Sequence, residues 1–161
     1  MRKALFVVCL SCLLTSLAVA QTKISGTFTC GKSSIEQLAP AGDRPNHSFG
    51  VTQASCTSTK PWSIAGVASK EGVGTDTLEA NGDVAKSRGV YVDTMENGDK
   101  AIYRVEATVT TTEGKVSATN KWQLVGGTGK LKGVKGQGTC KASGTTDSVA
   151  YDCDGEYTMP K

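Results

Sequence analysis

The chain has 161 residues, of which 38% are hydrophobic and 20% charged, and its formal net charge at pH 7 is +3. This length fits one domain with a sizeable hydrophobic core. The nearly balanced charges, without aromatic residues interleaved among the basic ones, argue against nucleic acid as a partner.

The first segment, 1–20, has the composition of a secretory signal peptide. Two basic residues precede an apolar run over 4–14, and small residues at 18–20 stand where a signal peptidase cuts. We therefore expect cleavage before Gln21 and a periplasmic or secreted protein. The mature chain, 21–161, would be a single domain with a charge of about +1, because two of the 18 basic residues leave with the signal. No second apolar run reaches the length of a membrane span.

Four cysteines remain in the mature chain: Cys30, Cys56, Cys140 and Cys153. An even number in an exported protein favours two disulfides over free thiols. Cys140 and Cys153 flank a short polar loop, so a hairpin there would place them opposite each other. We favour that pair together with Cys30–Cys56, and the other two connectivities stay open. No two cysteines have the close spacing of structural zinc ligands, so we predict no metal site.

Period-two alternation and turn residues predict a mostly β chain. The one exception is 33–38, where a short helical turn is expected before Pro40. The predicted strands are 23–30, 47–56, 62–69, 74–79, 90–95, 100–111, 116–124, 134–142 and 148–158. Such closely spaced strands fit a closed barrel or a sandwich, and continuous hairpins favour an antiparallel barrel of about eight strands.

Two of the strands show which face is buried. Odd positions in 101–111 and even positions in 116–124 are mostly apolar, so each strand has one face toward a core. Asn-Gly-Asp at 81–83 and 97–99, and Glu-Gly at 113–114, are typical of hairpin turns, because such turns need positive φ angles.

If the barrel encloses a cavity, we expect Tyr103, Asn120 and Trp122 in its wall. Asn120 lies among apolar residues on the inward face of its strand, so it needs a hydrogen-bond partner or a wet pocket. Tyr103 and Trp122 have the alternative role of core fillers.

The sequence supplies no catalytic set and no cofactor motif. The glycine-rich run 126–138 is followed by a strand, but Leu124 stands where a phosphate-binding loop requires glycine, and Leu131 where it requires Ser or Thr. His47, the single histidine, is expected at the surface or at a strand end, with no nucleophile motif nearby. We therefore predict neither a cofactor nor a catalytic residue.

The segment 124–136 resembles the glycine-rich segment of the allene oxide cyclase and dirigent β-barrels, where a Gly-Gly-Thr-Gly turn precedes a strand. With 97–100, 122–138 and 155–157, the chain is similar over 97–158 to small exported bacterial barrel proteins of unknown function. This resemblance implies an eight-stranded antiparallel barrel of the allene oxide cyclase type. It carries over no catalytic residue, because the functional side chains of both families lie on strands outside the glycine-rich turn.

These observations leave three hypotheses for function. The first is a non-enzymatic barrel that binds a small, partly apolar ligand or an envelope component. The second is a cyclase or isomerase, which would need a cavity holding an acid or base with a shifted pKa. The third is a structural or stress-related envelope protein whose barrel is filled with side chains. The sequence does not determine the oligomeric state.

Overall fold

A computed structural model describes residues 21–160 as ten strands and one 3₁₀ turn. The elements are β1 (Thr22–Gly31), β2 (Ile35–Pro40), β3 (His47–Lys60), β4 (Ser63–Ile64), β5 (Val67–Asn81), β6 (Val84–Met95), β7 (Lys100–Thr112), β8 (Lys115–Gly127), η1 (Gly129–Leu131), β9 (Lys135–Thr145) and β10 (Ser148–Thr158). No helix within this part of the chain is long and apolar enough to cross a membrane. The expected signal peptide lies outside the described residues.

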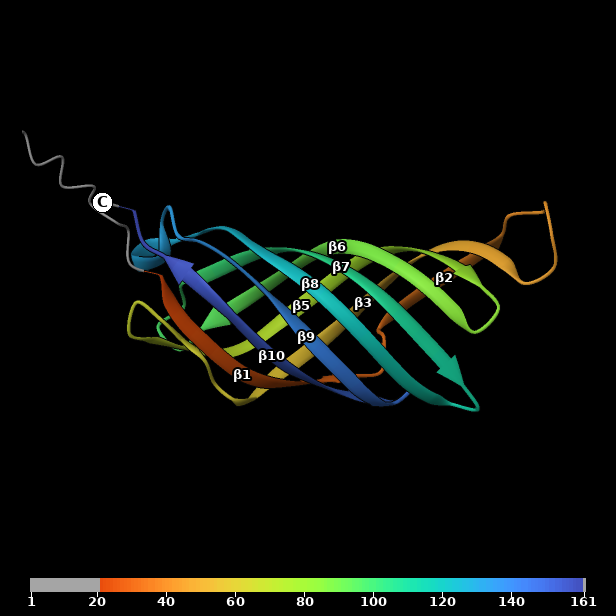
Figure 1. Ribbon diagram of the computed structural model, residues 1–161, viewed down its shortest axis with the longest axis horizontal. Helices are drawn as coiled ribbons and strands as arrows, with labels where there is room; N and C mark the ends of the chain where they lie inside the picture. The colour runs from red at the N-terminus through yellow and green to blue at the C-terminus, as the bar shows by residue number, and fades with distance from the viewer. Residues whose placement is uncertain (1–20, 161) are drawn as a thin grey trace, which may run out of the picture.

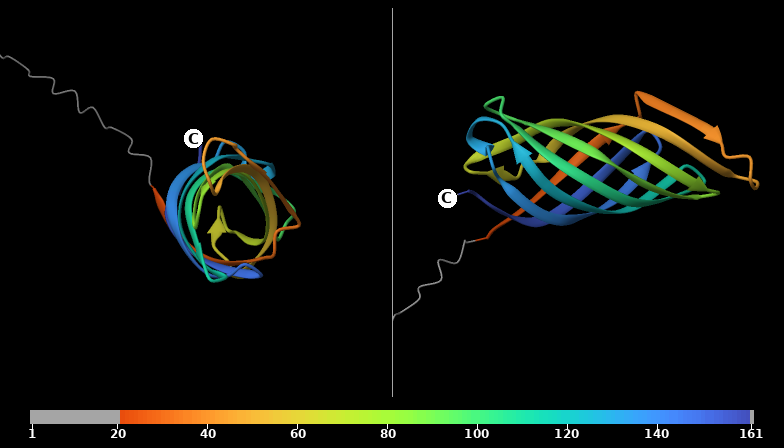
Figure 2. Two further views of the ribbon diagram at one scale, coloured as in Figure 1. Left: turned by 90° about the vertical axis from the view of Figure 1, so that its right-hand side faces the viewer. Right: turned by 90° about the horizontal axis from the view of Figure 1, so that it is seen from above.

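Eight strands form a closed antiparallel barrel, as the sequence predicted (Figure 1). Around the barrel the order is β1, β10, β9, β8, β7, β6, β5 and β3, and β3 closes the ring by pairing with β1. Where a barrel strand pairs with a neighbour on each side, its backbone has no free edge. The short β2 pairs with the first half of β3 and projects past the rim of the barrel (Figure 2).

The helical turn expected at 33–38 is wrong, because most of that segment belongs to β2. Its backbone pairs with β3 from Ile35 opposite Gln53 to Pro40 opposite Ser48. An isolated helix of six residues is unstable in water, whereas pairing with a neighbouring strand satisfies the backbone groups. The one 3₁₀ turn of the described chain lies instead in the glycine-rich run, at η1.

The predicted hairpin turns at 81–83, 97–99 and 113–114 join β5 to β6, β6 to β7 and β7 to β8. In the last of them, Glu113 and Gly114 have φ angles of 50° and 75°. Two consecutive residues with positive φ match the right-handed twist of paired strands. The strand expected at 62–69 is divided between β4 and the start of β5, and the strand expected at 74–79 is a later part of the same β5.

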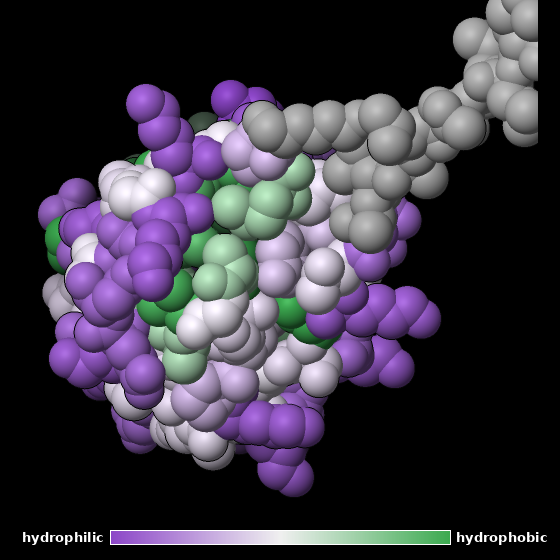
Figure 3. Space-filling view, turned by 90° about the vertical axis from the view of Figure 1, so that its left-hand side faces the viewer, coloured by the Kyte–Doolittle hydropathy of each residue, from purple (hydrophilic) through white to green (hydrophobic). Residues whose placement is uncertain are grey.

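The barrel interior is filled at one end only. That end holds the 3₁₀ turn and the β4 strand, and Figure 3 shows its outer face as a continuous packed surface with apolar side chains between hydrophilic ones. Its most deeply buried apolar residues, all under 5% exposed, are Trp62, Ile64, Met95, Ala101, Tyr103, Trp122, Leu124, Leu131 and Val134. This cluster forms the hydrophobic core and closes the barrel at that end.

Trp122 packs over two glycines on the neighbouring strands. It is paired with Gly138 of β9, which is paired in turn with Gly155 of β10. A Cβ atom would come within 2.3 Å of the indole at Gly138 and within 2.2 Å at Gly155. Both positions must therefore lack a side chain for the indole to approach the sheet this closely.

Replacing Gly155 by alanine should lower the free energy of unfolding by about 1–3 kcal/mol, because the new methyl group would collide with Trp122 in a packed core. Urea denaturation of the oxidised protein measures this change. Gly126→Ala on β8 is the matched control, since a Cβ there meets nothing within 4 Å. Equal stability of the two variants would contradict the packing described here.

Candidate functional site: the barrel cavity

The half of the barrel that is not filled contains a cavity of about 570 Å³. Its wall is built from all eight barrel strands and from β2. It extends to the end where the chain leaves β1 and where the β5–β6 and β9–β10 turns lie, since Gly31, Asp83 and Thr146 are among its lining residues. Figure 2 looks into the barrel from this end. The volume falls in the range of small-molecule sites.

All three side chains expected in a cavity wall line this cavity: Tyr103, Asn120 and Trp122. The structure brings Tyr103 and Trp122 together, with ring centroids 5.7 Å apart in an edge-to-face arrangement. Trp62 packs against both rings, at 5.7 Å from Tyr103 and 5.4 Å from Trp122. These aromatic rings form the boundary between the cavity and the packed end of the barrel.

Five cavity-lining side chains have a buried polar atom with no hydrogen-bond partner among the described residues. These atoms are Asp76 Oδ1, Tyr91 OH, Tyr103 OH, Asn120 Oδ1 and Trp122 Nε1. Buried polar groups in folded proteins are nearly always paired, with protein or with bound molecules. The side chains that line the cavity therefore include both donors and acceptors without a protein partner.

Asp76, on β5, is the half-buried acid of this site, and the sequence analysis missed it. It lies opposite Gly89 of β6, where a Cβ atom would be only 2.5 Å from Asp76 Oδ1. Burial raises its pKa from 3.8 to about 6. Burial is the main cause of the raised pKa of Tyr151 on β10, and the negative charge of Asp76 is the second cause. The sequence feature that could have identified Asp76 is an acid at an inward position between Gly74 and Leu78, both of which also line the cavity.

Asp93, on β6, is a second buried acid, and it does not line the cavity. Its side chain is fully buried, and Trp62 Nε1 donates a hydrogen bond to Oδ2 at 3.2 Å. Burial raises the pKa of Asp93 to about 7, against the lowering effect of the Trp62 hydrogen bond. The negative charge of Asp93 adds to burial in raising the pKa values of Tyr91 and Tyr103.

Two disulfides lie in the cavity wall. Cys30 is joined to Cys56 across β1 and β3, and Cys140 to Cys153 across β9 and β10, with Cα atoms 3.9 and 4.0 Å apart. Both pairs are directly opposite in the strand register, and both connectivities are those the sequence favoured. Two disulfides are compatible with an extracytoplasmic protein.

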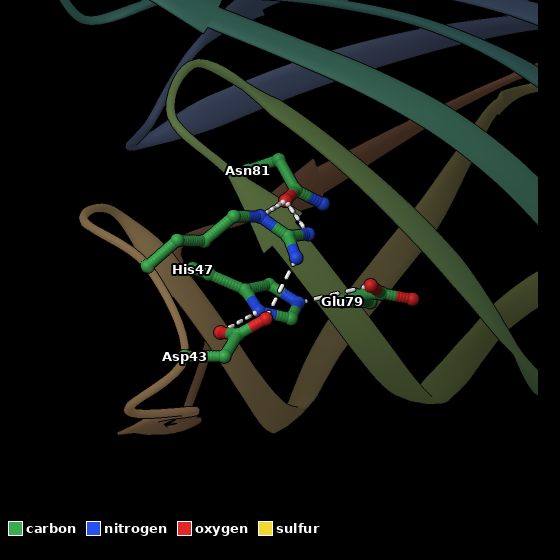
Figure 4. A network of polar contacts seen from close by, with 5 residues as sticks. Asp43, His47, Glu79 and Asn81 are labelled. Atoms are coloured by element: carbon green, nitrogen blue, oxygen red, sulfur yellow. Dashed lines mark hydrogen bonds and ion pairs between the residues drawn. The ribbon is translucent and has the colours of Figure 1, made fainter.

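His47 is the first residue of β3, one of the two places expected from the sequence, and its side chain is buried, with only 6% exposed (Figure 4). Its Nδ1 contacts Asp43 Oδ1 at 2.5 Å and its Nε2 contacts Glu79 Oε1 at 2.9 Å. The hydrogen bond to Asp43 is the main cause of a raised His47 pKa. Arg44 donates to Asn81 Oδ1 alongside. Because carboxylates occupy both ring nitrogens, this network anchors the β2–β3 loop to β5 and leaves no free base.

Within residues 21–160, no three His, Cys, Asp or Glu side chains are grouped to hold a metal ion. No family model and no curated protein match the chain. Among solved structures, the chain is similar to a conserved protein of unknown function from Rhodopseudomonas palustris, with a TM-score of 0.54 and 7% identity over 85% of this chain and 98% of that one. The similarity is one of fold. It supports the barrel, and it assigns neither the allene oxide cyclase nor the dirigent family.

Proposed function

We propose that this protein is an exported barrel that binds a small, partly apolar molecule inside its cavity. The observation that carries the proposal is the 570 Å³ cavity, closed at one end by the aromatic cluster around Trp62. A barrel of eight strands has room either for packed side chains or for one small ligand. Here the interior is filled along part of its length only.

The chemistry of the wall supports the same conclusion. Apolar side chains such as Leu78, Val105 and Val109 cover much of it, while a few polar atoms without partners converge from several strands. This combination is typical of small-molecule sites, where apolar area supplies affinity and a few polar groups fix orientation. A barrel with a purely structural role would have no need of such a wall, so a filled, structural barrel is the weaker hypothesis.

Native mass spectrometry of the mature protein, purified without denaturation, tests this proposal. Wild-type protein should carry an organic adduct that is absent from Ala107→Phe, because Ala107 of β7 lines the cavity and a phenyl ring there would occupy ligand volume. Thr108→Phe is the matched control, since the neighbouring Thr108 is exposed and on the outer face. If none of the three preparations carried an adduct, the result would favour a structural role over ligand binding.

A cyclase or isomerase is a second candidate, and the position of Asp76 favours it. A cavity carboxyl group whose pKa is raised to about 6 is suited to donate and accept protons near neutral pH. The released ligand, incubated with fresh protein, would then be converted into an isomer of equal mass that chromatography separates. An unchanged ligand would support binding without catalysis.

A further inference from the structure

We infer that the ligand carries a positive charge, as an amine or quaternary ammonium on an apolar body, and that this cation sits against Asp76 inside the barrel. The inference rests on the proposed binding function, and it names the chemical class of the ligand. The inference is supported by the different charges of the cavity wall and the outer surface of the barrel.

The cavity wall contains acids and no bases. Its lining residues include three carboxylates, Glu36, Asp76 and Asp83, and no Lys, Arg or His. The cations of the central strands are on the outside, where residues such as Lys86, Arg88, Arg104 and Lys121 are exposed. An anionic ligand would therefore meet three negative charges with no counter-charge in the wall, which makes fatty acids and phosphate esters poor candidates.

The three acids differ in depth. Glu36 and Asp83 are exposed, and Asp83 Oδ2 accepts a hydrogen bond from Thr112 Oγ1 at 3.2 Å. Asp76 is half-buried, and its Oδ1 is enclosed without a hydrogen-bond partner among the described residues. A buried carboxylate without a partner is unfavourable, and a cation brought next to it removes much of that cost. The outer acids would attract the same cation toward the opening.

Aromatic rings complete the site. Phe28, Trp62, Tyr91, Tyr103, Trp122 and Tyr151 all line the cavity. The faces of such rings attract ammonium groups, and their area binds the apolar part of the ligand. The pKa of Tyr151 responds to Asp76, which places that ring within electrostatic reach of the carboxylate. Tyr103 is 1% exposed, and its hydroxyl group has no partner in the described chain, so a polar ligand group has a donor or acceptor there as well.

Three probes of one shape test the inference: 4-phenylbutylamine, 4-phenylbutan-1-ol and 4-phenylbutanoate, titrated by calorimetry at pH 8. At this pH Asp76 is ionised, since its pKa is about 6. The amine should bind at least about tenfold more tightly than the alcohol, as expected for one partly buried charge pair, and the carboxylate should bind most weakly.

The variant Asp76→Asn keeps the size of the side chain and removes its charge. It should weaken amine binding by about tenfold or more and leave the alcohol unchanged. Asp154→Asn is the matched control, because Asp154 is an exposed acid outside the cavity wall on β10. Lowering the pH to 5 should weaken amine binding to wild type by about tenfold through protonation of Asp76, and should have little effect on Asp76→Asn. Tyr91 and Tyr151, which face the cavity from β6 and β10, remain neutral over this range, since burial raises both pKa values.

The outcomes separate this inference from the proposed function. If the alcohol binds as tightly as the amine, or the carboxylate binds most tightly, the cation preference is overturned while cavity binding stands. An unchanged amine affinity in Asp76→Asn overturns the role of that carboxylate. If none of the three probes binds, the inference fails, and binding of the neutral dye N-phenyl-1-naphthylamine decides whether the proposed function fails with it.

Discussion

Replacing Cys140 and Cys153 together by alanine should lower the free energy of unfolding by about 3 kcal/mol, and the double replacement of Cys30 and Cys56 should do the same. The two bridges span 13 and 26 residues of chain. Each one restricts the unfolded chain, and the loss depends only weakly on loop length. Removing both should cost about 6 kcal/mol, which is comparable with the whole stability of many small domains.

Urea denaturation of the two double variants and the quadruple variant measures these losses. Wild-type protein in reducing agent is the control, and it should unfold at nearly the same urea concentration as the quadruple variant. Alkylation of the unfolded but unreduced wild type should label no thiol at the four positions. Four labelled thiols, or double variants as stable as wild type, would show that the bridges are absent or without effect.

Asp93→Asn should raise the free energy of unfolding at pH 8 by about 2–4 kcal/mol. Asp93 is fully buried and its pKa is raised from 3.8 to about 7. The folded state therefore holds the proton more tightly than the unfolded state. The contribution of the Asp93 carboxyl group to stability is complete below pH 3.8 and is lost as the pH rises through 7. Asparagine carries no charge, and its carbonyl oxygen can still accept the hydrogen bond from Trp62.

Repeating the measurement at pH 4 supplies the internal control for Asp93→Asn. There the difference from wild type should shrink to less than about 1 kcal/mol, because the carboxyl group is protonated in the folded state and pH 4 lies close to its pKa of 3.8 in the unfolded state. Asp154→Asn, at an exposed position on β10, should leave stability almost unchanged at both pH values. A loss of stability in Asp93→Asn at pH 8 would mean that the carboxylate has a compensating partner.

The barrel was predictable because its strands repeat local signals. Alternation over 101–111 and 116–124 identified the inward faces, and Asn-Gly-Asp turns fixed where the chain reverses. Once strands pair in register, Tyr103, Asn120 and Trp122 must face the same interior, and Cys140 must lie opposite Cys153. These conclusions need only local pattern and strand geometry.

The features that were missed depend on packing. β2 is a strand because β3 offers its backbone an edge, which the sequence of six residues does not reveal. The cavity exists because inward positions such as Ala54, Ala85 and Ala107 are too small to fill the space between the strands. The raised pKa values of Asp76 and Asp93 follow from burial, and burial is known only after the side chains are placed.

The fluorescence of N-phenyl-1-naphthylamine, a neutral apolar dye that brightens in apolar surroundings, tests the central claim most directly. Titrated into wild type and the Thr108→Phe control, the dye should show saturable enhancement with one site, whereas Ala107→Phe should bind at least about tenfold more weakly, since the added ring fills part of the cavity. Both variants should keep the wild-type free energy of unfolding, measured by urea denaturation, within about 1 kcal/mol, so that loss of folding is not the cause. Equal enhancement by Ala107→Phe and wild type, or no saturable binding to any of the three, would contradict a ligand-binding barrel.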